Sequence, residues 1–250
     1  MRIGLALSLF AVLAFGSLAA ADLTITFKTS RKGPMGGDGA GSEIHYFSPE
    51  FSMVRNEKEQ RDALVDFRTG TTYTIDHKKK VIGKLTFEDA FAAMDALGKA
   101  QPAAMGQMMG AMFGDPNDCK VTRGGAETVA GRSCQDWDIK VGNLTMALAT
   151  DPTLKMPIPE AAYIRMVQAR AAQFAKAGPM GAIYKRLYEE MGKVRGIPLK
   201  THMGGMMGMD VSTEAIRIDT GAIPAATFAL PAGYATEDLG RKLREGAKGK

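Results

Sequence analysis

Apolar and polar residues alternate along the first part of the chain. Leu23, Ile25 and Phe27 alternate with polar residues, which is the pattern of a half-buried β-strand. The glycine-rich segment 32–41 that follows is expected to be a loop. Turn-forming residues then separate further strand-like runs, so a meander of short antiparallel strands is predicted. These runs occupy residues 43–48, 51–56, 61–68, 71–76 and 79–85.

The pattern changes to a helical period at residue 86. Thr86 is suited to be an N-cap, and Asp89 stands three residues later in a capping-box arrangement. A second helical region is predicted over 159–192, broken at Gly178-Pro179. The apolar face of the first helix includes Phe87, Phe91 and Met94.

Strand-like sequence returns between and after these helical segments. The runs lie at 118–123, 126–130, 133–140, 143–149, 197–203 and 211–218. Many short strands with helices in two insertions predict an α+β fold. We expect a curved antiparallel sheet, a half-barrel, with the helical insertions packed on its concave face.

The N-terminal residues have the features of a cleavable secretory signal. Arg2 precedes an apolar run, Leu5 to Phe15, which is too short to span a bilayer, and small residues follow up to Ala21. No later segment has the apolar length to cross a membrane, so export to a bacterial periplasm is predicted. The predicted division is a signal peptide at 1–21, one domain at 22–235 and a basic flexible tail at 236–250.

The charge of the chain bears on the partners that it can bind. The formal net charge is +5, much of it in the tail, and no basic cluster is interleaved with aromatic residues, which disfavours nucleic acid as a partner.

The two cysteines, Cys119 and Cys134, lie on either side of Gly124-Gly125. With a hairpin turn at those glycines and an oxidising compartment, a Cys119–Cys134 disulfide is expected.

Methionine is unusually abundant, with 17 in the chain. Two Met-Gly segments stand out, residues 105–114 and residues 202–209. The methionines of the first segment have the spacing of one helical face. Methionine there suits an irregular core, or a compliant groove for an apolar ligand. The groove hypothesis, with the helix at 86–98, assigns ligand binding to Phe87, Phe91, Met94, Met105, Met108, Met109, Met112, Met203, Met206 and Met207.

A third interpretation of the second Met-Gly segment is a Cu(I) site. Thioether sulfur and imidazole are ligands that suit Cu(I). A regular strand would place such ligands on opposite faces, so only the glycines could bring them together. The candidate ligands are His202, Met203, Met206, Met207 and Met209.

Four short segments together resemble a bacterial family of exported proteins known as a domain of unknown function. They contain a strand ending in Ile-Asp, an Ala-Gly-x-x-Cys hairpin, a Gly-Ile-Pro strand start and a terminal Pro-x-Gly-Tyr. In this chain they are residues 70–80, 127–134, 196–200 and 228–234.

More distantly, the meander with helical segments resembles the periplasmic lipoprotein-carrier fold of the LolA/LolB type. That resemblance implies an open half-barrel whose apolar concave face receives acyl chains. It carries over no catalytic residue, and the basic and aromatic groove positions of the carriers have no residue-by-residue match here. Carrier function is therefore an analogy at the level of fold.

Sequence signatures of catalysis are missing from the chain. It has no Gly-x-Ser-x-Gly, no His-Glu-x-x-His and no phosphate-binding loop. Its three histidines are His45, His77 and His202. We therefore expect a non-enzymatic periplasmic protein, without cofactor, that binds or carries an apolar or lipid-like ligand in a Met-rich groove. The alternatives are Cu(I) binding and a structural role alongside other envelope proteins.

Overall fold

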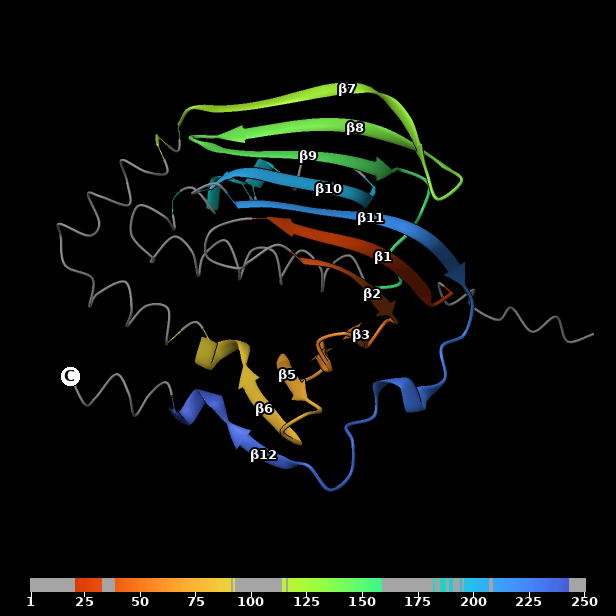
Figure 1. The fold of residues 1–250 in the computed structure, drawn as a ribbon, viewed down its shortest axis with the longest axis vertical. Coiled ribbons are helices and arrows are strands. Elements are labelled where there is room, and N and C mark those ends of the chain that lie inside the picture. Colours follow the sequence, from red (N-terminus) through yellow and green to blue (C-terminus); the bar gives the residue numbers. More distant parts are fainter. Residues whose placement is uncertain are drawn as a thin grey trace, which may run out of the picture.

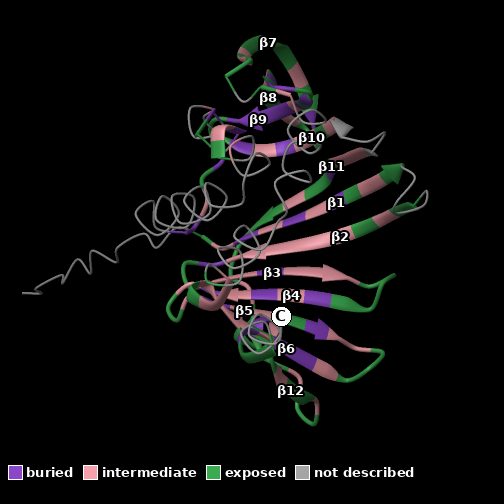
Figure 2. Cartoon of the chain, turned by 90° about the vertical axis from the view of Figure 1, so that its left-hand side faces the viewer, coloured by how far each residue is buried: buried purple, intermediate pink, exposed green. Residues whose placement is uncertain are grey.

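The described residues form one large β-sheet. The computed structural model describes residues 21–32, 39–90, 92, 114–115, 117–158, 182, 185–187, 189–190, 194, 196–206 and 209–242. Twelve strands lie in the order β12-β6-β5-β4-β3-β2-β1-β11-β10-β9-β8-β7, with β7 and β12 at the two ends (Figure 2). All neighbouring strands are antiparallel except β12 and β6, which are parallel.

The first six strands belong to the N-terminal half of the chain. They are β1 (Leu23–Lys32), β2 (Gly39–Phe47), β3 (Phe51–Asn56), β4 (Arg61–Asp66), β5 (Thr71–Asp76) and β6 (Val81–Thr86). The remaining strands are β7 (Cys119–Val129), β8 (Arg132–Val141), β9 (Leu144–Asp151), β10 (Ile197–Met206), β11 (Met209–Thr220) and β12 (Ala235–Asp238). A short 3-10 helix, η1 (Ala225–Phe228), precedes β12.

Strands β3 to β6 repeat with a regular period. Each has six residues, and four-residue turns separate them. The last residue of each turn, Gln60, Gly70 or Lys80, has a positive φ between 53° and 59°. A left-handed residue there closes the turn and returns the chain antiparallel, so the four strands share one register.

The C-terminal segment crosses one face of this meander. After β11, residues 221–234 run past the intervening strands to β12, which pairs with β6 at the far edge (Figure 1). Phe228 of η1 is buried in a cluster with Met53, Leu64, Ile75 and Ile82. These four side chains come one each from β3, β4, β5 and β6, so the segment covers one face of all four strands.

The predicted α+β half-barrel with helical insertions on its concave face was wrong. The described residues form a mainly β fold, with helix limited to short pieces such as 87–90 and 239–242. The sheet is open, because β7 and β12 are not paired with each other. It is also mixed, because β12 joins β6 in parallel. Most of the two segments predicted as helical lies outside the described residues.

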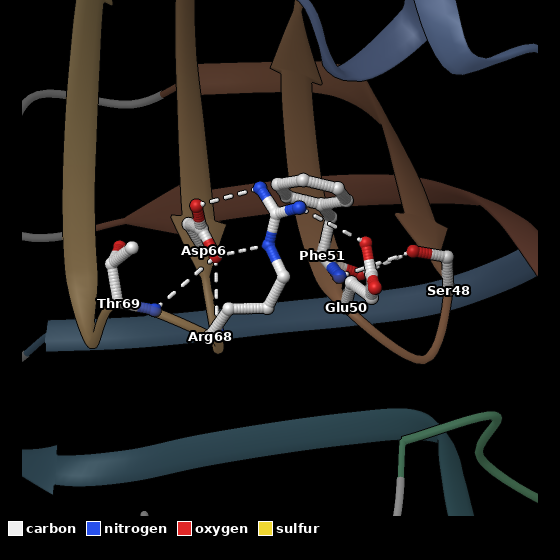
Figure 3. A network of polar contacts seen from close by, with 6 residues as sticks. All are labelled: Ser48, Glu50, Phe51, Asp66, Arg68 and Thr69. Carbon is white, nitrogen blue, oxygen red and sulfur yellow. Dashed lines mark hydrogen bonds and ion pairs between the residues drawn. The ribbon is translucent and has the colours of Figure 1, made fainter.

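A hydrogen-bonded network joins the β4–β5 turn to the β2–β3 turn (Figure 3). Arg68 binds Asp66 through two nitrogens, each 3.1 Å from a carboxylate oxygen, and reaches Glu50 at 3.3 Å. Its guanidinium also lies 4.4 Å from the centre of the Phe51 ring. That ring stacks on Phe228 at 5.3 Å, so the network supports the contact between η1 and the sheet.

The predicted Cys119–Cys134 disulfide is also wrong, because the hairpin turns at a different place. Both thiols are free, and β7 continues through Gly124-Gly125 as a bulge, with the turn at Ala130-Gly131. Cys119 consequently pairs with Val141, seven residues beyond Cys134 along β8. Seven strand residues span about 23 Å, far more than the ~7 Å that a disulfide allows between Cα atoms.

Free thiols give the first testable prediction. Iodoacetamide added to the denatured, unreduced protein should alkylate both cysteines, because no bridge protects them. Burial raises the pKa of the Cys134 thiol, with the nearby Asp151 carboxylate adding to the effect, so labelling of the native protein should be slow there. Intact mass spectrometry measures the number of labels on the denatured protein and the rate of labelling of the native protein. A chain that takes up label only after reduction would contradict the hairpin register.

The Asp66–Arg68 pair gives a prediction on pH. The Arg68 guanidinium holds the pKa of the Asp66 carboxyl below its ordinary value. A lowered folded-state pKa stabilises the fold above the unfolded value of about 3.9, and this stabilisation is lost as pH falls through the folded value. Asp66→Asn should therefore lose about 1–2 kcal/mol of unfolding free energy at neutral pH. The difference from wild type should shrink below about pH 4.

Denaturant unfolding at several pH values measures this difference. The matched control is Asp219→Asn, which breaks an exposed pair with Arg217 at 2.8 Å and should cost less than about 0.5 kcal/mol. An Asp66→Asn penalty that is the same at every pH would contradict the charge-based explanation.

Candidate functional site

A groove crosses the face of β3 to β6 opposite η1. Its volume is about 550 Å³, within the range of small-molecule sites. A smaller depression shares Glu43, Asn56 and Glu59 with it and continues toward Arg31 and Gly41 at the ends of β1 and β2. The groove therefore runs across the strands rather than along them.

The floor of the groove is a row of short side chains. Val54, Ala63, Thr74 and Gly83 are successive cross-strand partners on β3, β4, β5 and β6. Direct partners in an antiparallel sheet project to the same face, so these four residues form one line across it. Their neighbours within each strand project to the other face and pack against Phe228. The strand register thus gives the meander one filled face and one shallow face.

Polar and charged residues border the row at the ends of the strands. Asn56, Arg61 and Asp76 form the next cross-strand row, and all three line the groove. A backbone hydrogen bond from Lys79 lowers the pKa of Asp76, and Arg61 lies 3.7 Å from that carboxylate. This side of the groove offers both signs of charge to a polar group.

Glu43 continues the charged border on β2. Its carboxylate accepts a hydrogen bond from Asn56 at 3.2 Å and lies 3.3 Å from the His45 ring. The hydrogen bond with His45 is the main cause that lowers the pKa of Glu43, against the opposing effect of burial. The carboxylate is thus held ionised beside the apolar floor.

The structure places three of the predicted ligand-binding residues. Phe87 follows β6 and packs against Gly70 of the β4–β5 turn, with its backbone N–H donating to the Gly70 carbonyl at 2.8 Å. Met203 of β10 packs against a core cluster that contains Met146. Met206 is described in its backbone only and pairs with Met209. In the sheet, β11, β1 and β2 separate β10 from the groove on β3 to β6.

The other predicted ligand-binding residues lie outside the described residues. They are Phe91, Met94, Met105, Met108, Met109, Met112 and Met207.

His202 and Met203 do not converge on one point. Met203 packs with apolar side chains, whereas His202 lines a depression with Lys120 and Asp138 and lies 3.6 Å from Asp210. Successive residues of a strand project to opposite faces of the sheet, so β10 places the side chains of His202 and Met203 on different sides. Across the described part of the chain, no group of three or more His, Cys, Asp or Glu side chains could hold a metal ion.

Two of the sequence motifs meet at His77. Its Nε2 lies 3.0 Å from the buried Asp62 carboxylate, and its Nδ1 lies 3.0 Å from the Tyr234 hydroxyl. A carboxylate can only accept, so Nε2 carries a hydrogen and donates it to Asp62, while Nδ1 and the Tyr234 hydroxyl share the second hydrogen bond. The strand ending in Ile-Asp is thereby joined to the terminal Pro-x-Gly-Tyr.

The other two motifs meet at Asp151. This carboxylate is 1% exposed and accepts hydrogen bonds from Arg132, from Thr153 and from the Leu154 backbone. Burial alone would raise the pKa of Asp151, but these hydrogen bonds lower it overall. Gly196 has φ +100°, and a Cβ there would clash with the Asp151 carbonyl. The hairpin motif and the Gly-Ile-Pro motif thus form a structural junction.

The row of short side chains was missed from the sequence. Its members stand in four different strands, and nothing in their spacing marks them until the cross-strand register is known. A usable signal is the regular alternation of six-residue strands and four-residue turns, from which the partners Val54, Ala63, Thr74 and Gly83 can be counted.

Comparison with known proteins identifies the family. The family described as "Domain of unknown function (DUF4412)" matches residues 66–234, so the chain belongs to it, and the resemblance predicted from the motifs is confirmed. No curated protein matches the sequence significantly. Among the described residues, no helix has the length and apolar character to cross a membrane.

Several solved structures match most of this chain at low sequence identity. An uncharacterized conserved protein from Thermus thermophilus has TM-score 0.47 and 6% identity, with 88% of this chain and 91% of that chain covered. PNGF-II has TM-score 0.43 and 10% identity over 91% of this chain, which spans only 33% of PNGF-II. The LolA superfamily protein NE2245 from Nitrosomonas europaea has TM-score 0.33 and 10% identity, with coverages of 84% and 91%.

The hydrogen bond between His77 and Tyr234 gives a prediction about stability. Tyr234→Phe removes the hydroxyl that is hydrogen-bonded to Nδ1 and should cost about 1 kcal/mol of unfolding free energy. The control is Tyr73→Phe, because the Tyr73 hydroxyl forms no hydrogen bond within the described residues and should matter little. Chemical denaturation measures both variants. Equal losses for the two would show that the His77 contact contributes nothing.

Proposed function

We propose that this protein is an exported, non-enzymatic binding protein that takes up an amphipathic, lipid-like ligand in the groove across β3 to β6. The aliphatic part of the ligand lies along Val54, Ala63, Thr74 and Gly83. Its polar part lies toward the charged border at the strand ends. Export itself remains a prediction from the N-terminal sequence.

The row of short side chains is the observation that carries this proposal. On the other face of the same strands, Phe228 packs over the large side chains of Met53, Leu64, Ile75 and Ile82. The groove face instead has a volume of about 550 Å³ above short residues. An aliphatic chain laid there would exclude water from the floor, which stabilises binding by about 0.8 kcal/mol per buried methylene.

The charged border supports an amphipathic rather than a wholly apolar ligand. Arg61 is 64% exposed at its side chain, so its guanidinium remains accessible to a polar group while it pairs with Asp76. Glu43 and Asp76 both have lowered pKa values and stay ionised at neutral pH. A ligand without polar groups would leave these charges partly desolvated, at a cost in affinity.

We extend the proposal to the methionine-rich segments predicted from the sequence. Met108 and Met109 would add adaptable apolar surface to the same ligand. Replacing both with Glu should weaken uptake of an apolar probe while the fold is retained.

A substitution on the floor tests the proposal. Ala63→Phe fills the middle of the row and should weaken binding of the fluorescent probe N-phenyl-1-naphthylamine at least about tenfold, since it removes the space for the probe. Probe fluorescence during titration with the protein measures the affinity, and thermal unfolding verifies that the variant is folded.

The matched control is Ala226→Phe. Ala226 lies exposed in η1 and does not line the groove, so the same substitution there should leave probe binding unchanged. Wild-type protein that does not bind the probe, or folded Ala63→Phe that binds it as tightly as wild type, would refute the proposed site.

A further inference from the structure

One end of the groove is closed by a side chain from the C-terminal part of the protein. Leu239 follows β12 directly and lines the groove beside Glu237. A Cβ built on Gly83 would lie 2.6 Å from the Leu239 Cδ1 atom and 2.6 Å from the Thr74 hydroxyl. Leu239 therefore reaches over the last member of the row and can do so only because residue 83 has no side chain.

Local contacts hold Leu239 in this position. The backbone N–H of Arg241 donates to Asp238 at 2.8 Å, and Lys242 pairs with Glu237 at 2.7 Å, which fixes the helical turn at 239–242. Gly240 is buried against Asp89, and a Cβ there would clash with that carboxylate. The turn is thus anchored both to β12 and to the segment after β6.

The side chain of Leu239 has the chemistry of the ligand proposed above. It is a branched aliphatic group lying on the floor of the groove, where the end of an aliphatic chain would lie. It is only partly buried, so its outer side borders the open part of the groove.

We infer that Leu239 closes the β12 end of the groove and sets the length of aliphatic chain that the groove accepts. This inference rests on the proposed function. A chain that runs from the charged border along Val54, Ala63 and Thr74 meets Leu239 at Gly83 and can extend no further.

The size of the closing side chain should then determine chain length. Leu239→Ala removes three carbon atoms and opens the floor over Gly83, so the optimal chain should lengthen by two or three carbons, about the number removed. Each methylene newly accommodated should tighten binding about fourfold. Leu239→Phe enlarges the closing group and should shorten the optimal chain.

Competition measures the effect. The probe N-phenyl-1-naphthylamine is displaced with n-alkyl carboxylates of increasing length, from octanoate to hexadecanoate, and with the corresponding alcohols to separate the contribution of the polar group. The chain length at which affinity stops rising is compared between wild type, Leu239→Ala and Leu239→Phe. Leu230→Ala is the matched control, because Leu230 is 40% exposed and does not line the groove.

The outcomes separate this inference from the proposed function. Opposite shifts in the two variants, with Leu230→Ala unchanged, would support Leu239 as the determinant of chain length. Suppose that wild type binds the probe and that Ala63→Phe abolishes binding. If either folded Leu239 variant then keeps the wild-type dependence of affinity on chain length, the inference about Leu239 is overturned, whereas the groove remains supported as the binding site. If wild type binds no probe or alkyl chain, both are overturned.

Discussion

The packing of Phe228 against β3 to β6 is the contact on which the rest of the structure depends. Phe228 is only 9% exposed and touches a cluster with a member in each of the four strands. Removing such a side chain from a core typically costs about 3–5 kcal/mol. The same contact fixes the path of residues 221–234, and therefore brings β12 to the edge of β6 (Figure 1).

Because one face of the meander is filled in this way, the other face is left shallow. A strand places alternate residues on opposite faces, so large residues at Met53, Leu64, Ile75 and Ile82 alternate with the short row that forms the groove. The polar junction of Asp62, His77 and Tyr234 and the Arg68 network hold the covering segment at two places. The contacts at His77 and at Asp151, which join the four sequence motifs in pairs, therefore serve the scaffold, whereas Thr74 and Asp76 of the 70–80 motif line the groove.

The sequence predicts the strands well where local chemistry is decisive. The alternation of Leu23, Ile25 and Phe27 identifies β1 and its buried face, and the regular turns identify β3 to β6. Prediction from the sequence fails where the same short sequence is compatible with two different structures. Gly124-Gly125 suits a hairpin turn as well as a bulge, and choosing the turn led to the wrong cysteine pairing.

Other features depend on contacts between distant residues and could not be predicted locally. β12 is four residues of mixed polarity, Ala-Thr-Glu-Asp, and becomes a strand only because β6 offers an edge. The groove is likewise a product of register, since a shift of one residue in β4 or β5 would replace Ala63 or Thr74 by a larger side chain from the other face.

The bulge in β7 has a consequence for association between molecules. An open sheet has two edges, and an exposed edge strand is a template on which another chain can add. At one edge β12 offers only four residues, and at the other the ladder of β7 shifts register between Arg123 and Ala126. Neither edge presents a long, regular row of unpaired backbone groups. A sheet of twelve strands can thus remain open at both ends and still be a poor seed for fibril growth.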